Sequence, residues 1–339
     1  MTASSPAART AETTDATEAA EATDATRAAR AAQAAQAADP TEATPGPGGP
    51  LGSVVIPAHN EQAVIAACLA PLAPLAESGA LEIVVVCNGC TDATAEVART
   101  FAGVRVVELP VGSKPAALRA GDRAVSALPR MYLDADVVLP PDAARQVLSR
   151  LSAGGSRSGR RGAAPLAGRP PVRYDAAGAT LPVRRYYRAR SRIPAVLGSL
   201  WGAGTYALSA EGRTRFGEFP DLVADDLWVD QLFAPGELEI VDCSPVTVTA
   251  PARTGDLLRV LRRTYRGKAE HHSINPDTAY ETSGGTARDL VRLARSGPSG
   301  FLDATVYLGL VLTARILFRL SRDGSWERDD SSRSPTGRD

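Results

Sequence analysis

The chain has 339 residues, and its 38 basic and 38 acidic residues give a formal net charge of zero. This length suits one large domain or two small ones. Four cysteines in a chain of this size exclude a fold built on disulfides and favour a reducing compartment, so we expect a cytoplasmic protein.

The first fifty residues contain 18 alanines and no Leu, Ile, Val, Phe, Tyr or Trp. Such a segment buries too little surface to offset its ordering entropy, so residues 1–50 are predicted to be a disordered tail. The segment lacks the basic start and apolar core of a secretory signal. Residues 322–339 are polar and are likewise predicted to form a disordered tail.

Strands and helices alternate from residue 51 to residue 151. Short β-branched runs predict strands, and apolar residues at helical spacing predict helices. The short connections imply parallel strands with crossover helices, in a sheet that is covered on both faces. The predicted strands are 51–57, 81–87, 104–109 and, together with the exit from the strand, 130–139. The predicted helices are 61–75, 91–102, 114–128 and 142–151.

The next segment, 153–172, is rich in Gly, Arg and Pro and is predicted to be a flexible loop. Between residues 156 and 194 there are ten arginines and one acid, Asp175. The alternatives are a solvated segment and a basic flap over an anionic ligand. A protein that binds nucleic acid through these arginines is a further alternative. The sequence contains no RNA- or DNA-binding motif, so we expect no nucleic acid partner.

Further along, 237–249 is predicted to be a strand and 255–272 a basic helix. We therefore expect one α/β domain over residues 51–280. A helical segment is predicted to follow it over residues 285–321.

Polar residues follow three of the predicted strands, within 57–61, 87–92 and 134–136. In an open parallel sheet, ligands bind beyond the carboxyl ends of the strands. Asp134 and Asp136 are two residues apart, so on an extended backbone their side chains point to the same side. Such a carboxylate pair suits a hard divalent cation, so we expect Mn²⁺ or Mg²⁺, which in turn can hold a diphosphate.

Cys87 and Cys90 form a C-x-x-C pair, which raises the alternatives of a redox motif and a zinc site. A structural zinc site needs two further ligands, and Cys68 and Cys243 do not have the spacing of a second pair. A redox motif needs an activated thiol at a helix N-terminus. We therefore favour a turn in which the two cysteines have neither role.

Five segments in this order resemble glycosyltransferase family 2, and the resemblance covers about residues 54–272. They read VVIPAHNE, VVVCNGCTDAT, SKPAALRAG, MYLDADVVL and ADDLWVDQLF. The resemblance implies the GT-A fold of nucleotide-diphospho-sugar transferases, with a mostly parallel central sheet and helices on both faces. It also implies an inverting enzyme that moves a sugar from a nucleoside-diphosphate sugar donor to a hydroxyl acceptor with a divalent metal.

The resemblance assigns roles residue by residue. Asp226 is the implied catalytic base, with Asp225 second because the family usually has Glu-Asp at this pair. Asp136 and Asp134 are the implied metal ligands. The residues expected to bind the donor or the acceptor are Pro57, Ala58, Asn60, Glu61, Asn88, Asp92, Lys114, Asp134, Trp201, Gly202, Gly204, Arg263 and Arg266.

Some of these positions keep a second interpretation. Asp225 and Asp226 could cap a helix, since acids favour helix N-termini. Cys87 and Asn88 stand where relatives have a carboxylate that reads the base, so the pattern does not select uridine. His271 or His272 could complete the metal shell or form a surface pair.

Residues 301–320 are apolar, but their uncharged part, 304–314, has only eleven residues, and about twenty are needed to span a bilayer. Arg315, Arg319 and Arg322 group on one side of a helical wheel. The alternatives are a helix on a membrane surface and a helix docked on the domain. A surface helix would fit a saccharide or lipid-linked acceptor, with the protein at the inner face of the cell membrane.

The sequence therefore favours a glycosyltransferase that works in cell-envelope polysaccharide or glycolipid synthesis. The alternative is a non-catalytic relative that binds sugar nucleotides or glycans. The presence of all four acids argues against a degenerate relative, because such a protein is expected to have lost some of them. These acids are Asp134, Asp136, Asp225 and Asp226.

Overall fold

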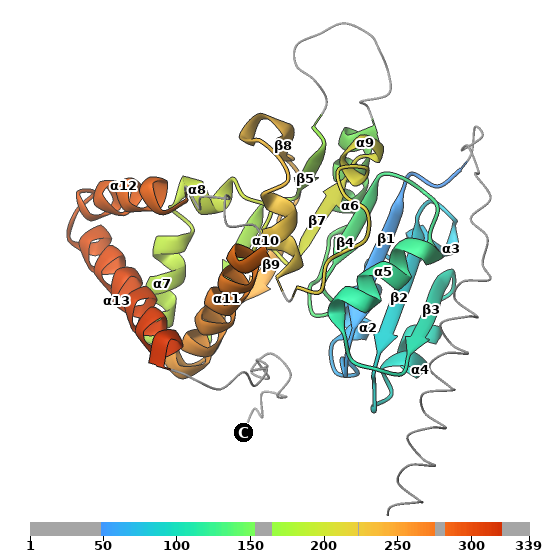
Figure 1. The fold of residues 1–339 in the computed structure, drawn as a ribbon, viewed down its shortest axis with the longest axis horizontal. Helices are drawn as coiled ribbons and strands as arrows, with labels where there is room; N and C mark the ends of the chain where they lie inside the picture. Colours follow the sequence, from blue (N-terminus) through green and yellow to red (C-terminus); the bar gives the residue numbers. More distant parts are fainter. Residues whose placement is uncertain (1–48, 153–164, 223, 275–281, 321–339) are drawn as a thin grey trace, which may run out of the picture.

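The computed structural model describes residues 49–152, 165–222, 224–274 and 282–320 (Figure 1). Nearly all of the two predicted tails lies outside the described residues. Residues 153–164, the larger part of the predicted loop, also lie outside the described residues.

A seven-stranded sheet forms the centre of the larger part of the molecule, in the order β3-β2-β1-β4-β7-β5-β8. Strands β1 to β4 are parallel, β7 is antiparallel to both β4 and β5, and β8 is parallel to β5. The mostly parallel sheet confirms the predicted fold class. The strands are β1 (Ser53–Ala58), β2 (Glu82–Asn88), β3 (Val104–Leu109), β4 (Arg130–Leu133), β5 (Ala167–Arg169), β7 (Thr205–Leu208) and β8 (Leu238–Ile240).

Helices cover both faces of this sheet (Figure 1). Successive side chains of a strand point to opposite faces, and β1 shows this directly. Val54 and Ile56 pack into one core, and Val55 packs into the other with α5 (Lys114–Ala124). The first core is closed by α2 (Ile65–Leu69), α3 (Ala73–Glu77), α4 (Thr94–Arg99) and α6 (Pro141–Ser152).

Two predicted elements are each divided in the structure. The helix predicted over 61–75 is broken into α2 and α3, because proline has no backbone N–H to continue a helix and Pro71 lies between them. The strand predicted over 237–249 is divided into β8 and β9 (Val246–Thr249), with Pro245 between them. Strand β9 belongs to a separate two-stranded sheet with β6 (Val172–Asp175).

The predicted flexible loop ends earlier than residue 172. Residues 167–169 form β5 inside the main sheet. Arg169 is almost fully buried, and its guanidinium donates to three backbone carbonyls, those of Leu197, Ser199 and Pro170. These bonds satisfy the buried donors and fix the strand, so composition alone misjudged this segment.

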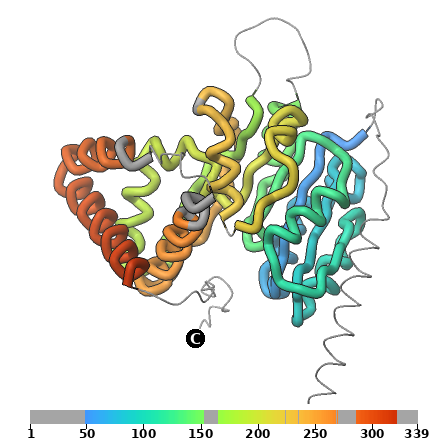
Figure 2. The backbone as a smooth tube through the Cα atoms, in the orientation of Figure 1, coloured from blue at the N-terminus to red at the C-terminus, as the bar shows by residue number. Residues whose placement is uncertain are grey.

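A group of helices stands beside the sheet (Figure 2). Helix α13 packs against α7, α11 and α12 around a shared apolar core. Helices α12 and α13 lie in the predicted C-terminal helical segment, and α11 matches the predicted basic helix. The group consists of α7 (Leu181–Arg190), α8 (Pro194–Leu197), α11 (Thr254–Ile274), α12 (Thr282–Ala294) and α13 (Pro298–Leu320).

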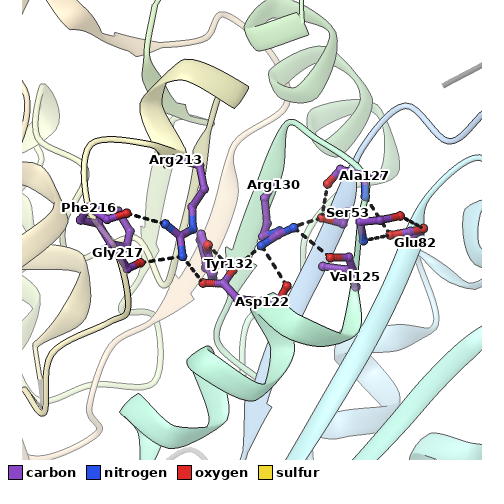
Figure 3. A network of polar contacts seen from close by, with 11 residues as sticks. Ser53, Glu82, Asp122, Val125, Ala127, Arg130, Tyr132, Arg213, Phe216 and Gly217 are labelled. Carbon is purple, nitrogen blue, oxygen red and sulfur yellow. Dashed lines mark hydrogen bonds and ion pairs between the residues drawn. The ribbon is translucent and has the colours of Figure 1, made fainter. Parts of the chain in front are cut away.

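A buried ion-pair network joins β4 to α5 and α9 (Ala210–Arg213) (Figure 3). The Asp122 carboxylate accepts hydrogen bonds from Arg130 Nη1 at 2.6 Å, Arg213 Nη2 at 2.7 Å and the Tyr132 hydroxyl at 2.7 Å. The side chains of Asp122 and Arg130 are only 10% and 8% exposed. Each buried charge therefore depends on its partner, because an unpaired charge in this position is costly.

We expect Asp122→Asn to lower the free energy of unfolding by about 3 kcal/mol, because two guanidinium groups lose their buried counter-charge. Asp221→Asn is the matched control, since Asp221 also pairs with an arginine, at 2.6 Å, but is 81% exposed. The control should cost less than about 1 kcal/mol. Denaturant unfolding measures both variants, and equal losses would contradict a special role for the buried network.

Candidate active site

A narrow crevice opens at the carboxyl ends of β1 and β4. Pro57 of β1 and Asp134 after β4 form one side, and Lys114 lies at the start of α5. The other side comes from β7 and from α10 (Asp225–Asp230). Its lining residues are Pro57, Lys114, Leu118, Tyr132, Leu133, Asp134, Gly204, Thr205, Tyr206, Asp225 and Asp226.

The Lys114 ammonium lies between two carboxylates. Its Nζ atom is 2.8 Å from Asp134 Oδ1 and 2.8 Å from Asp225 Oδ1. Burial alone would lower the pKa of Lys114, but Asp134, Asp225 and Asp226 outweigh it and raise that pKa above its ordinary value. Lys114 is therefore positively charged and holds three segments of chain, α5, the end of β4 and α10, at one point.

Asp225 and Asp226 occupy different environments at the start of α10. Asp225 is buried, with Oδ1 beside Lys114 and Oδ2 accepting a hydrogen bond from the Tyr206 hydroxyl at 2.9 Å. Asp226 is half-buried, and its oxygens accept the backbone N–H groups of Gly202 and Leu227, both at 2.8 Å. The two acids therefore have different partners. Asp225 contacts an ammonium group and a phenol, whereas Asp226 accepts hydrogen bonds from the backbone.

The environment of Asp226 makes it a better proton acceptor than an ordinary aspartate. Burial raises its pKa first, and the neighbouring Asp225 carboxylate adds to this, while Lys114 and the Gly202 N–H act in the opposite direction. The net result is a pKa of about 6. A base that is ionised just above this pH combines a correct protonation state with useful basicity.

The turns after β1 and β2 are joined by a row of hydrogen bonds. Asn60, with a φ of 53°, accepts from the Thr91 N–H at 2.8 Å, and the Glu61 N–H donates to Thr94 Oγ1 at 2.8 Å. Asp92 accepts the Gln62 N–H at 3.1 Å and the Thr94 N–H at 3.1 Å. Three predicted donor-binding residues therefore lie together, namely Asn60, Glu61 and Asp92. Their polar groups join the two turns to each other.

Asn88 connects these turns to a third. Its Nδ2 donates to the Ala58 carbonyl at 2.8 Å, and its Oδ1 accepts the Ser113 N–H at 2.9 Å. The side chain is buried, so its amide is committed to the backbone at the ends of β1 and β3. The contacts of Asn88 therefore support a role in fixing these loops.

Cys90 lies in the same turn. The Asn60 N–H donates to Cys90 Sγ at 3.4 Å, and the thiol lies 3.5 Å from the Ala58 carbonyl. A hydrogen bond from the Cys87 thiol lowers the pKa of Cys90 to about 6, while Cys87 itself is shifted upward. Within the described residues no group of three or more His, Cys, Asp or Glu side chains could hold a metal ion.

Asp134 and Asp136 follow β4, as the sequence predicted. Asp136 is exposed, and the Asp134 backbone N–H donates to the Gly204 carbonyl at 2.8 Å. Two carboxylates, one of them exposed, fit Mn²⁺ or Mg²⁺, because such ions often take only one or two protein carboxylates and complete their shell with water and substrate phosphate. The donor set therefore fits a divalent cation that arrives with a diphosphate.

The loop before β7 shapes the opposite wall. Gly202 and Gly204 have φ values of 78° and 68°, a left-handed conformation that glycine adopts without strain. A Cβ on Gly204 would lie 2.4 Å from a Val137 methyl group. Trp201, a predicted acceptor-binding residue, is half-buried. The Arg190 guanidinium lies 4.9 Å from the centre of its ring, so the ring already contacts Arg190.

Helix α11 carries the predicted cationic residues. A Cβ on Gly267 would lie 2.6 Å from the Ala224 Cβ, so α11 approaches the residue that precedes α10 very closely. Arg263 is exposed and lies one helical turn before Gly267, on the same face of the helix. Arg266 is the residue immediately before Gly267. The side chains of His271 and His272 lie outside the described residues.

Sequence reasoning missed Tyr206 as a structural partner of the acids. It stacks on Tyr132 with ring centres 5.0 Å apart, and burial together with Asp225 raises its pKa, so its hydroxyl stays a donor to Asp225. No local sequence signal identifies this contact, because Tyr206 and Asp225 lie on different elements, β7 and α10.

Comparisons with known proteins identify a family for part of the chain. Residues 53–192 match the model of the family described as glycosyl transferase family 2, which confirms the resemblance over that range. Residues 53–192 therefore belong to a family 2 glycosyltransferase domain. A comparison with curated proteins found no match.

Solved structures of glycosyltransferases resemble the chain. The mannosyltransferase PcManGT from Pyrobaculum calidifontis, in complex with GDP-Man and Mn²⁺, is 18% identical with a TM-score of 0.53, and the match covers 88% of this chain and 94% of that one. This similarity shows a shared fold. Glucosyl-3-phosphoglycerate synthase from Mycobacterium tuberculosis also matches, with 24% identity, a TM-score of 0.45, and coverage of 65% and 78%.

We expect the double variant Cys87→Ser, Cys90→Ser to keep glycosyl transfer within a few-fold of the wild-type rate. A serine hydroxyl at position 90 can still accept from the Asn60 N–H and donate to the Ala58 carbonyl. Cys90→Ala removes both contacts and should weaken donor binding more than the double variant does. Metal content and donor affinity are measured for each protein. Stoichiometric zinc that disappears in the double variant would contradict this interpretation of the cysteines.

Proposed function

We propose that this protein transfers a sugar, with inversion, from a nucleoside-diphosphate sugar to the hydroxyl of a saccharide or lipid-linked acceptor. The observation that carries the proposal is the crevice in which Asp226, with its raised pKa, lies next to the Asp225–Lys114–Asp134 ion pairs. A proton acceptor and a charge-neutralising centre at one strand edge are what a direct displacement at a sugar carbon needs.

In the proposed mechanism, Asp226 takes the proton from the acceptor hydroxyl as that oxygen attacks the anomeric carbon. The two backbone N–H groups on Asp226 fix the direction of its carboxylate. Asp225 and Tyr206 keep Lys114 in place, and Lys114 positions Asp134. Inversion follows because a single attack from the opposite side expels the nucleoside diphosphate.

We propose Asp136 and Asp134 as the residues that would hold Mn²⁺ or Mg²⁺. When bound, such an ion neutralises the charge that develops on the departing diphosphate. PcManGT is a relative in fold whose complex contains GDP-Man and Mn²⁺, which supports the choice of ion and donor class. Arg263 and Arg266 on α11 are proposed to add positive charge on the diphosphate side.

We also propose a cytoplasmic location at the inner face of the cell membrane, with a role in cell-envelope polysaccharide or glycolipid synthesis. The support is the apolar C-terminal helix together with a chain whose four cysteines are all free. A non-catalytic relative of the same fold is the second candidate. It is less well supported, because a simple binding site has no need for a base with a raised pKa.

The proposed base can be tested by its pH dependence. The Asp226 carboxylate must be ionised to act, and its pKa is about 6, so the transfer rate should fall as the pH is lowered through 6 and level off above 7. Asp226→Asn should reduce single-turnover transfer by on the order of 10²-fold or more, with donor affinity nearly unchanged. Asp225→Asn should cost less in transfer rate. A dead Asp225→Asn beside an active Asp226→Asn would move the base to the neighbouring residue.

The proposed metal ligand can be tested without turnover. Asp136→Asn should abolish Mn²⁺-dependent binding of a nucleoside diphosphate, because an amide is a much poorer ligand for a hard cation than a carboxylate. Calorimetry with and without Mn²⁺ measures this, and melting temperature confirms that the fold is intact. Asp142→Asn, at an exposed acid on α6, is the control and should bind normally. Unchanged Mn²⁺-dependent binding in Asp136→Asn would contradict the assignment.

A further inference from the structure

Helix α13 carries most of the exposed apolar surface in the described part of the chain. Its 23 residues are long and apolar enough to cross a membrane. Only 22% of its most apolar stretch is buried. The large apolar side chains it exposes are Phe301, Leu302, Leu308, Leu312, Ile316, Leu317 and Leu320.

The opposite face of α13 is bound to the protein. Asp303 is fully buried and forms an ion pair with Arg185 of α7 at 2.9 Å. Tyr307 stacks on Tyr186, which also belongs to α7, with ring centres 4.8 Å apart and ring planes at 6°. If α13 left the domain to cross a bilayer, Asp303 would enter hydrocarbon without its counter-charge, at a large cost. The helix therefore stays docked along one face and exposes the other.

Within the described residues of α12 and α13, every exposed charge is positive. No exposed side chain of α13 is acidic, and Arg315 and Arg319 lie in its last turns. At the other end of the α12–α13 pair, a hollow is lined by Arg288, Val291, Arg292, Arg295 and Ser296. Asp289, the acid of this part of α12, is mostly buried and pairs with Arg292 at 3.5 Å. An apolar centre between clusters of arginine matches a surface with anionic groups above a hydrocarbon layer.

We infer that the exposed faces of α12 and α13 dock this protein on a lipid bilayer with anionic headgroups, with α13 lying flat on the membrane surface. The apolar side chains enter the boundary between headgroups and acyl chains. Arg315 and Arg319 keep their charged ends among the headgroups while their stems stay in apolar contact. The hollow beside Val291 receives a lipid phosphate. The inference does not depend on the proposed catalytic chemistry.

Flotation of the full chain with vesicles tests this inference. We expect binding to vesicles of equimolar phosphatidylcholine and phosphatidylglycerol and much weaker binding to phosphatidylcholine alone. Leu312→Ser with Ile316→Ser should reduce the apparent affinity by roughly tenfold or more, because two side chains lose their apolar burial. Leu181→Ser, at an exposed leucine on α7, is the control and should bind like wild type.

The charged contribution needs its own variants. Arg288→Gln with Arg295→Gln should reduce affinity for the anionic vesicles by roughly tenfold and leave binding to phosphatidylcholine unchanged. Arg145→Gln, at an exposed arginine on α6, is the control. Asp226→Asn should float like wild type, which separates this test from the test of catalysis. Melting temperatures confirm that every variant is folded.

Several results would overturn the inference. The first is an absence of flotation with anionic vesicles, and the second is equal binding to both kinds of vesicle. The third is a dimer in solution that Leu312→Ser with Ile316→Ser dissociates, since a second copy of the chain would then cover this face. High salt or alkaline carbonate should release the bound protein. Protein that resists both treatments would indicate a spanning helix and would also contradict the flat arrangement.

Discussion

The site depends on a single ammonium group. Lys114 is one of only two lysines in a chain with 38 basic residues, and it lies 2.8 Å from an oxygen of Asp134 and of Asp225. Without a cation at this point, three carboxylates from the end of β4 and the start of α10 would repel one another in a partly buried crevice. An arginine would fill the space differently, because its planar fork cannot act as a compact point charge between two acids.

This arrangement also explains why two adjacent aspartates differ. Lys114 and the Tyr206 hydroxyl contact Asp225, so its negative charge is already stabilised by close partners. Asp226 has only two backbone N–H groups nearby and faces the charge of Asp225, which raises its pKa. Two adjacent residues of the same type thus have different partners, and Asp226 is left as an available proton acceptor. The same logic separates paired carboxylates in other catalytic sites.

Much of the fold could be predicted from the sequence, because each early strand is a short β-branched run and each connection is brief. The strand over 104–109 is predicted with its observed bounds. The errors occur where a local rule competes with the pattern, as at Pro71 and Pro245, or where tertiary contacts override composition, as at Arg169 in β5. The strand-end acids were predictable because spacing on one short segment places them. The contact of Tyr206 with Asp225 was not, because it joins two segments far apart in the chain.

Helix α13 shows why hydropathy alone does not decide how a segment meets a membrane. Length and apolar content are properties of the whole helix, whereas docking depends on which side each residue faces. Asp303 is one residue of 23, so it changes the mean hydropathy of the helix little. Its ion pair nevertheless fixes the helix to Arg185. Its burial commits one face to the protein, and the remaining face keeps nearly all of the large apolar side chains. A helix divided in this way is suited to lie between a domain and a surface, with its polar contacts on the side where the domain can satisfy them.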